Sequence, residues 1–76
     1  MKYAKEKRLR KLGANVKRIR KVEYRSQEML AEVLDEDRLR IARVESGAHE
    51  SGVLLFVDIA KACHVSLDEL MGNLDD

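Results

Sequence analysis

The 76-residue sequence contains no proline and no tryptophan, and it has one cysteine and four glycines. With so few helix breakers and many helix-forming residues, the composition predicts one small all-α domain. A single cysteine excludes an internal disulfide and suits a reducing compartment. The longest apolar run, Val53 to Val57, has five residues and is too short for a membrane span or a secretion signal. We therefore expect a soluble, cytoplasmic protein.

Charge is divided unevenly along the chain, although the net charge is only +1. Residues 1–25 contain eleven basic residues and two acids, whereas residues 26–76 contain four basic residues and twelve acids. The first segment therefore has a net charge of +9 and the second a net charge of −8. So dense a basic segment suits phosphate backbone, an anionic membrane surface or an acidic protein, with a solvated helix face as the plain alternative. The basic helix carries no Trp or Phe on its apolar face, which argues against the membrane.

Apolar residues spaced by three and four predict an amphipathic first helix. Gly13 weakens its middle by about 1 kcal/mol relative to Ala. We therefore expect the compact helix to begin near Leu12, with residues 1–11 as a basic N-terminal extension of it. The expected inner face consists of Leu9, Leu12, Val16, Ile19 and Val22.

Capping residues divide the rest of the chain into four more short helices. Their expected N-caps are Ser26, Asp37, Ser51 and Ser66, of which Ser66 opens the capping-box pattern "SLDE". Gly47 stands where a left-handed residue ends a helix. We expect the domain to cover residues 12–72 and a frayed acidic tail to cover residues 73–76.

Two of these segments, "SQEMLAEVL" and "RLRIARVESG", read as short helices joined by a tight turn. Their residues resemble the phage-repressor-like helix-turn-helix family, which includes the lambda repressor and Cro type and is also called the XRE family. The likeness continues into "IAKACHVSLDELMG" and covers about Leu12 to Gly72. It implies a compact five-helix DNA-binding domain with the helix-turn-helix at the second and third helices. In such a motif the second helix lies in the major groove.

The resemblance also implies roles for single residues. Gln27 would contact a phosphate or a base edge, and Arg40 would face phosphate. For Lys17 in the first helix, the basic charge of that helix, and not the resemblance, predicts contact with the DNA backbone. Arg20 and Glu45 would form a structural ion pair that ties the first helix to the third. The base-facing positions would be Asp37, Arg38, Leu39 and Arg43.

Arginine chemistry agrees with this assignment, because a guanidinium forks onto guanine O6 and N7. Arg38 and Arg43 are five positions apart and share a helix face only in part. This spacing suits one base reader and one flanking contact, and we expect Arg38 to be the base reader. The alternative for these arginines is a solvated helix surface.

Four positions depart from the family pattern. Tyr24 replaces the usual glycine and Arg25 an apolar residue, so we expect the first helix to run longer and the Tyr24 ring to fill the vacated space. Asp35 replaces the turn glycine, and aspartate tolerates the left-handed conformation. Glu36 replaces a core residue and is expected in solvent or paired with a lysine or arginine. The acids Asp35, Glu36 and Asp37 favour the helix start but should repel phosphate.

The segment "VLLFV" is apolar on every side of a helix and predicts a dimer interface. The inner side is expected to hold Val53, Phe56, Val57 and Ala60. The outer side would then form a self-complementary surface in a homodimer; isolated surface leucines are the alternative. The residues expected in this interface are Leu54, Leu55, Leu67 and Met71.

The sequence shows no enzyme active site, cofactor motif or small-molecule ligand site. Cys63 and His64 are adjacent and lack further ligands, so we expect no metal; Cys63 should pack as a small hydrophobe and His64 should lie in a turn. The expected function is a sequence-specific transcriptional regulator that binds double-stranded DNA, either as a repressor or as an activator. The alternative is a protein-interaction module on the same fold, an adaptor or antitoxin-like protein with weak or lost DNA binding.

Overall fold

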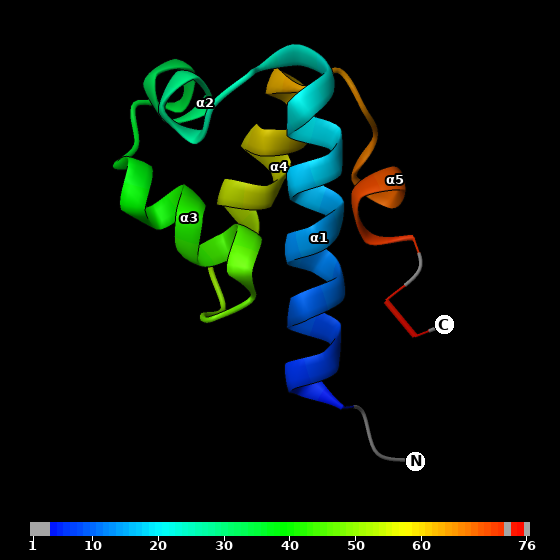
Figure 1. Ribbon diagram of the computed structural model, residues 1–76. Coiled ribbons are helices and arrows are strands. Elements are labelled where there is room, and N and C mark those ends of the chain that lie inside the picture. Colours follow the sequence, from blue (N-terminus) through cyan, green and yellow to red (C-terminus); the bar gives the residue numbers. More distant parts are fainter. Residues whose placement is uncertain (1–3, 73, 76) are drawn as a thin grey trace.

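The computed structural model describes residues 4–72 and 74–75. This part of the chain contains only helices and turns, so the expected all-α, five-helix fold is confirmed (Figure 1). The helices are α1 (Lys5–Glu23), α2 (Gln27–Leu34), α3 (Arg38–Ser46), α4 (Val53–Ala62) and α5 (Leu67–Met71).

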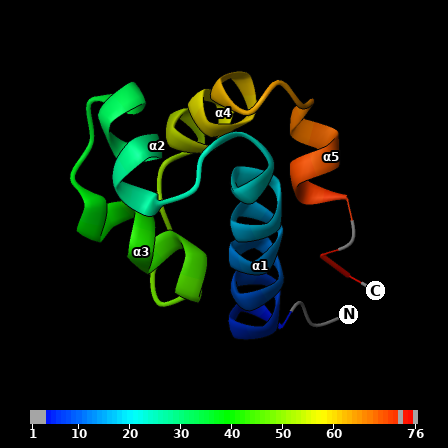
Figure 2. The ribbon, with the colours of Figure 1, turned by 45° about the horizontal axis from the view of Figure 1, so that its top comes forward.

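The long helix α1 organises the molecule. Figure 2 shows α3 on one side of α1 and α5 on the other, with α2 and α4 closing the bundle. α1 packs against α3 and α5, α2 against α3 and α4, and α4 against α5. The first turns of α1 extend past α3 (Figure 1).

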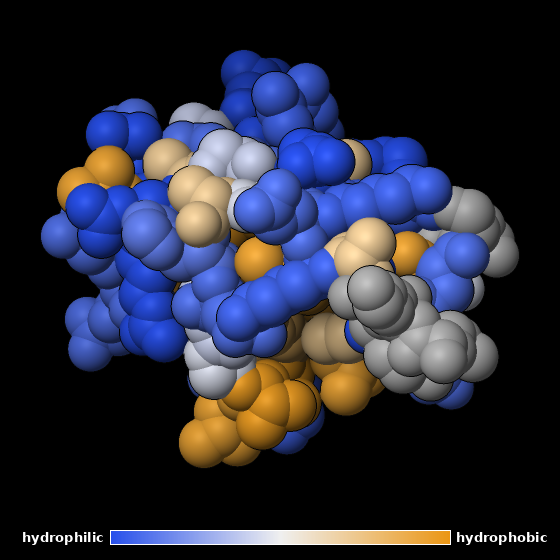
Figure 3. Space-filling view, turned by 90° about the horizontal axis from the view of Figure 1, so that it is seen from below, coloured by the Kyte–Doolittle hydropathy of each residue, from blue (hydrophilic) through white to orange (hydrophobic). Residues whose placement is uncertain are grey.

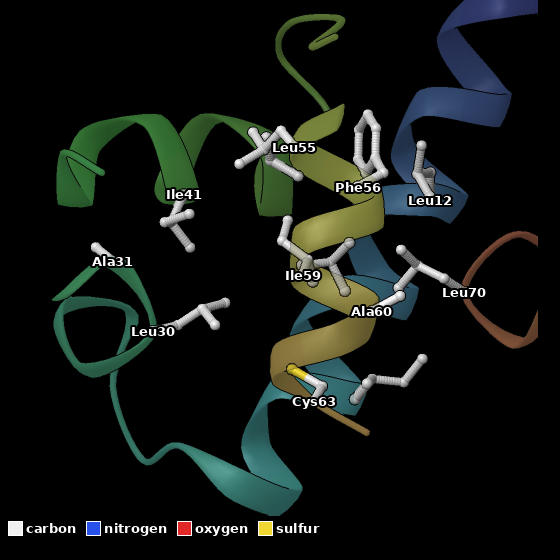
Figure 4. Close-up of a cluster of buried hydrophobic side chains, with 13 residues drawn as sticks. Leu12, Leu30, Ala31, Ile41, Leu55, Phe56, Ile59, Ala60, Cys63 and Leu70 are labelled. Atoms are coloured by element: carbon white, nitrogen blue, oxygen red, sulfur yellow. The ribbon is translucent and has the colours of Figure 1, made fainter. Parts of the chain in front are cut away.

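Every helix contributes side chains to one core (Figure 4). Each fully buried Leu, Ile or Val side chain contributes about 1.5–3 kcal/mol. The expected inner face of α1 is correct for Leu12, Val16 and Ile19, but Val22 is 83% exposed. Two successive steps of three residues rotate Val22 by about 120° away from Val16. The largest fully buried side chains are Leu30, Ile41, Ile59, Leu70 and Val16.

Three of the helices begin at the N-cap residues that the sequence predicts. The side chains of Ser26, Asp37 and Ser66 accept hydrogen bonds from the backbone N–H of Met29, Leu39 and Glu69, each at 3.1 Å. The expectation for Ser51 is wrong. α4 begins one residue later, after Gly52, with no side-chain cap.

Tyr24 ends α1. The helix stops at Glu23 because Tyr24 is extended (φ −130°), so the expectation of a longer first helix is wrong. The expected filling by the ring is confirmed, since Tyr24 packs against the core and its hydroxyl donates to the Ala62 carbonyl at 3.0 Å. Arg25 is exposed.

Gly13 is the point of closest approach between α1 and α3. A Cβ atom there would lie 2.5 Å from the carbonyl oxygens of both Val44 and Glu45. Gly47, which ends α3 at φ +73°, similarly faces the backbone of Arg10, which a Cβ would meet at 2.8 Å. The two glycines therefore let the two helix backbones touch.

The described C-terminal residues Leu74 and Asp75 lie beside the start of α1. Arg8 Nε lies 3.0 Å from Asp75 Oδ1, and Leu74 is half-buried against the core. The expected domain boundary at residue 12 stays a prediction, as does the tail at 73–76, of which residues 73 and 76 lie outside the described part.

Candidate nucleic-acid interface

α2, the turn at residues 35–37 and α3 have helix-turn-helix geometry. Asp35 adopts the left-handed conformation expected of it, with φ 55°. The Glu36 N–H donates to the Ala31 carbonyl at 2.8 Å, which closes the turn. α3 then directs Ile41 into the core and exposes Leu39 and Arg43. The motif thus leaves one side of α3 exposed.

The acids before α3 have structural partners. Arg40 Nη1 lies 2.8 Å from each carboxylate oxygen of Glu36, so the expected pairing of Glu36 with a basic residue is confirmed. Asp37 caps α3 by accepting from Leu39 N–H. The negative charge of the turn is therefore offset in part by Arg40, one helical turn away.

A buried ion pair connects α1 to α3. Arg20 Nε donates to Glu45 Oε2 at 2.6 Å, and Arg20 Nη2 donates to Glu45 Oε1 at 3.1 Å. Both side chains are nearly inaccessible, at 4% and 2% exposure. Arg20 Nη1 also donates to the Tyr24 carbonyl at 3.1 Å. Removing one partner of such a buried pair lowers the free energy of unfolding by about 3–5 kcal/mol. Because the two hydrogen bonds are parallel, the pair also fixes the orientation of α3 relative to α1.

Gln27 extends this ion pair to the start of α3. Its Nε2 donates to Glu45 Oε1 at 3.0 Å, and its Oε1 accepts from Arg38 Nη1 at 3.2 Å. Four side chains from three helices therefore form one hydrogen-bonded row. Sequence reasoning placed Gln27 and Arg38 on the DNA side and did not predict this link between them.

The arginines of α3 differ in what holds them. Arg38 is bonded to Gln27 and Arg40 to Glu36. The exposed guanidinium of Arg43 makes no hydrogen bond to the described residues. Arg43 also lines a shallow groove of about 500 Å³ between α3 and the loop after it. The groove residues on α3 are Asp37, Leu39, Arg40 and Arg43, and the loop supplies His49, Glu50, Ser51 and Gly52. No motif in the sequence indicated that this loop borders the site.

Lys17 lies on the part of α1 nearest α3. It is exposed, and at 100° per residue it shares a side of the helix with Gly13 and Arg20, which both contact α3. Lys17 therefore lies on the side of α1 that faces α3.

Asn15 is a buried polar residue that sequence reasoning missed. Its Nδ2 donates to the Leu70 carbonyl at 2.9 Å, and its Oδ1 accepts from Arg18 Nη2 at 3.2 Å. Asn15 thereby ties α5 to α1. An asparagine within a basic helix gives no local signal of burial.

The predicted dimer surface requires correction. Leu55 is 5% exposed and belongs to the core, whereas Val53, expected inside, is 63% exposed. Because every position of the segment is apolar, the sequence did not fix which side of α4 faces inward. Leu54 is 74% exposed, and Leu67 and Met71 are half-buried against the core. Figure 3 shows hydrophobic side chains gathered along one edge of the molecule.

Cys63 and His64 have the local structure expected of them. Cys63 is buried and unpaired, and His64 lies in a turn with φ 59°. Burial raises the pKa of the Cys63 thiol, and the Glu23 carboxylate raises it further. The described residues contain no group of three potential metal ligands, and none of the described helices is long and apolar enough for a membrane span.

Comparison with known proteins agrees with this geometry. The helix-turn-helix family HTH_3 matches residues 16–70, from the middle of α1 to α5. Neither the curated proteins nor the solved structures gave a match. The family match covers most of the chain and both helices of the motif. The chain therefore belongs to the phage-repressor-like (XRE) helix-turn-helix family of DNA-binding regulators.

Proposed function

We propose that the protein is a sequence-specific transcriptional regulator that binds an inverted-repeat operator as a homodimer, in the cytoplasm of a bacterial or phage-infected cell. The observation that carries this proposal is the construction of α3. Its inner side is held to α1 by the Arg20–Glu45 ion pair, while its outer side exposes Leu39 and the unbonded guanidinium of Arg43. A rigidly held helix with a free arginine fork suits direct readout in the major groove.

The roles of the site residues follow from what holds each one. Arg43 is the principal base reader, with its fork on guanine. Leu39 contacts a thymine methyl, and Asp37 accepts from cytosine N4. Arg38, the base reader expected from the sequence, is instead the flanking contact on this proposal, because its guanidinium is bonded to Gln27.

Three further residues contact the sugar-phosphate backbone on this proposal. Lys17 approaches it from α1, and Arg40 approaches it from α3. Gln27, at the start of α2, meets a phosphate next to the bases that α3 contacts. These contacts set the position of the protein on the duplex.

The exposed side of α4 is the proposed dimer contact. Val53 and Leu54 are exposed and Val57 is half-buried. Asp58 and Lys61 border them on the same exposed side. In a two-fold arrangement each subunit contributes the same patch, so Asp58 of one subunit can lie near Lys61 of the other. Leu67 and Met71 would extend this surface where they remain exposed.

The test is selection of bound duplexes from a random-sequence library at about 0.15 M salt, with the wild type, Arg43→Ala and Lys17→Ala. The wild type should enrich an inverted repeat. Arg43→Ala should lose preference at one base pair of each half-site, worth about 1–3 kcal/mol. Lys17→Ala should keep the same motif and bind all duplexes more weakly.

Equal behaviour of the two variants would contradict the assignment of base reader and backbone contact. A folded wild type that enriches no sequence would reject the regulator. The acidic start of α3 would then favour the alternative, a protein-interaction module.

A further inference from the structure

The outward side of α1 carries a basic surface that none of the roles above explains as a whole. At 100° per residue, six basic side chains fall within a sector of about 120°, opposite the buried side of the helix. The acids of α1, Glu6 and Glu23, fall outside this sector. We call this surface the α1 basic face; its residues are Lys7, Arg10, Lys11, Lys17, Arg18 and Lys21.

The basic residues at the other positions of α1 pair with acids. Lys5 Nζ lies 3.0 Å from Glu50 Oε2, Arg8 pairs with Asp75, and Arg20 pairs with Glu45. Within the described part of the chain, no residue of the α1 basic face lies in an ion pair with an acid. Intramolecular acids thus neutralise the other cations and leave this face fully positive.

This distribution opposes helix stability. Lys7 and Lys11, like Lys17 and Lys21, are like charges four residues apart, and each such pair costs about 0.2–0.5 kcal/mol. Basic residues in the first turns of a helix also oppose its macrodipole. A face that disfavours the isolated helix is explained by a partner that compensates the charge.

The α1 basic face is continuous with the exposed side of α3. Lys17 and Arg10 lie at the edge of α1 next to α3, where Gly13 and Gly47 allow the two backbones to touch. From Lys7 to Lys21 the face is about 21 Å long, which matches the axial rise of about six phosphates on one DNA strand. A duplex placed against α3 can therefore continue along α1.

We propose that the α1 basic face binds the phosphate backbone of DNA that flanks the bases contacted by α3, without regard to sequence. This inference rests on the proposed function and extends it. The family match begins at residue 16, so Lys7, Arg10 and Lys11 lie outside the part that the family likeness covers. The face lengthens the footprint and supplies attraction that the acidic start of α3 lacks.

The test compares two double variants with the same change in net charge. Lys7→Gln/Lys11→Gln removes two charges from the α1 basic face, whereas Lys5→Gln/Arg8→Gln removes two charges of the same helix that lie outside the face and pair with acids. Glutamine suits a helix interior, and thermal unfolding checks that both variants fold. Binding to the selected operator is measured between 0.1 and 1 M salt, on a long duplex and on one trimmed to the operator.

On the long duplex, Lys7→Gln/Lys11→Gln should lower the steepness of the log–log salt dependence by about 1.8, or about 0.9 for each lost phosphate contact. This corresponds to roughly thirtyfold weaker binding at 0.15 M salt and no difference near 1 M. The difference from wild type should shrink on the trimmed duplex, and the enriched motif should stay unchanged. Lys5→Gln/Arg8→Gln should bind much as the wild type does.

Three results would overturn this proposal. Equal losses in the two variants would attribute the effect to net charge. If Lys7→Gln/Lys11→Gln bound DNA as tightly as the wild type, the α1 basic face would not bind DNA and would serve another partner, such as an acidic protein. An altered motif would make these lysines part of base readout. Failure of the proposed function is a different result, because the wild type itself would then select no operator.

Discussion

At the scale of single residues, Gly13 lowers the stability of α1 as an isolated helix but allows α1 to pack closely against α3. Glycine lowers helix stability by about 1 kcal/mol relative to alanine, because it loses more backbone freedom. In the folded chain, however, the missing Cβ leaves room for the carbonyl oxygens of Val44 and Glu45. The position therefore sacrifices local helix stability for direct contact between α1 and α3.

We predict that Gly13→Ala destabilises the protein, although alanine is the better helix former. A Cβ atom 2.5 Å from two backbone oxygens forces α1 and α3 apart. The expected loss is about 1–3 kcal/mol in the free energy of unfolding, measured by urea denaturation. Gly52→Ala is the matched control, because a Cβ at Gly52 has no neighbour within 4 Å. Equal stability of Gly13→Ala and the wild type would contradict the close approach.

Residue-scale features were predictable where their cause is local. The caps at Ser26, Asp37 and Ser66 and the left-handed Asp35 depend on a few neighbouring positions, and the sequence contains those positions. Asn15 and Gly13 depend on the backbone of helices far away in the chain. A single sequence shows Gly13 only as a weakness, and the contacting carbonyls appear once α3 is in place.

At the scale of elements, the start of α3 explains why three acids stand before a helix proposed to bind a polyanion. Asp35 makes the turn, Glu36 pairs with Arg40, and Asp37 caps the helix. Each acid thus has a structural role in a segment of only three residues. The same three carboxylates repel phosphate and therefore weaken the attraction of α3 to DNA.

We predict that the two effects of Asp37 separate in two substitutions. Asp37→Asn keeps a side-chain oxygen for Leu39 N–H, so the protein should stay as stable as the wild type, while its affinity for random duplex rises. Asp37→Ala also removes the cap and should lower the free energy of unfolding by about 0.5–2 kcal/mol. Urea denaturation and salt titrations on random duplex measure the two effects. If Asn and Ala lowered stability equally, Asp37 would not act as a cap.

Which side of α4 faces the core could not be predicted from the sequence. Helices with polar and apolar sides, such as α2, show their inner face in the spacing of Leu30, Ala31 and Leu34. Every residue from Val53 to Val57 is apolar, so periodicity does not distinguish a buried from an exposed position. Packing against the other helices decides it, placing Leu55 in the core and Leu54 at the surface. The ion pair of Arg20 with Glu45 was predicted from the family likeness, and its extension through Gln27 to Arg38 was not.

At the scale of the whole molecule, three surfaces have different chemistry. The outer side of α3 mixes arginine, leucine and acid, the α1 basic face is purely cationic, and the start of α4 exposes Val53 and Leu54. On the proposals above, these surfaces provide selectivity, attraction and assembly. The near-zero net charge of the chain hides this division.

We predict that Leu54→Glu dissociates the dimer and leaves the monomer folded, because Leu54 is 74% exposed and outside the core. Burying one leucine is worth about 1.5–3 kcal/mol, and a two-fold contact contains it twice. The dimer dissociation constant, measured by sedimentation equilibrium, should rise about a hundredfold or more. Val33→Glu, at an exposed position on α2, is the matched control and should leave assembly unchanged. A wild type that sediments as a monomer would contradict the α4 contact.

The buried ion pair between α1 and α3 has a consequence for how such a regulator evolves. The groups that fix the orientation of α3 lie on its inner side, whereas Leu39 and Arg43 have no partner there and no part in the ion pair. On the proposed function, we therefore expect mutations at these two positions to alter target preference without an accompanying loss of folding. If the proposed roles hold, duplicated copies of the gene would diverge toward new operators through changes at these two positions, whereas Asp37, Arg38 and Arg40 are constrained because they also support the structure.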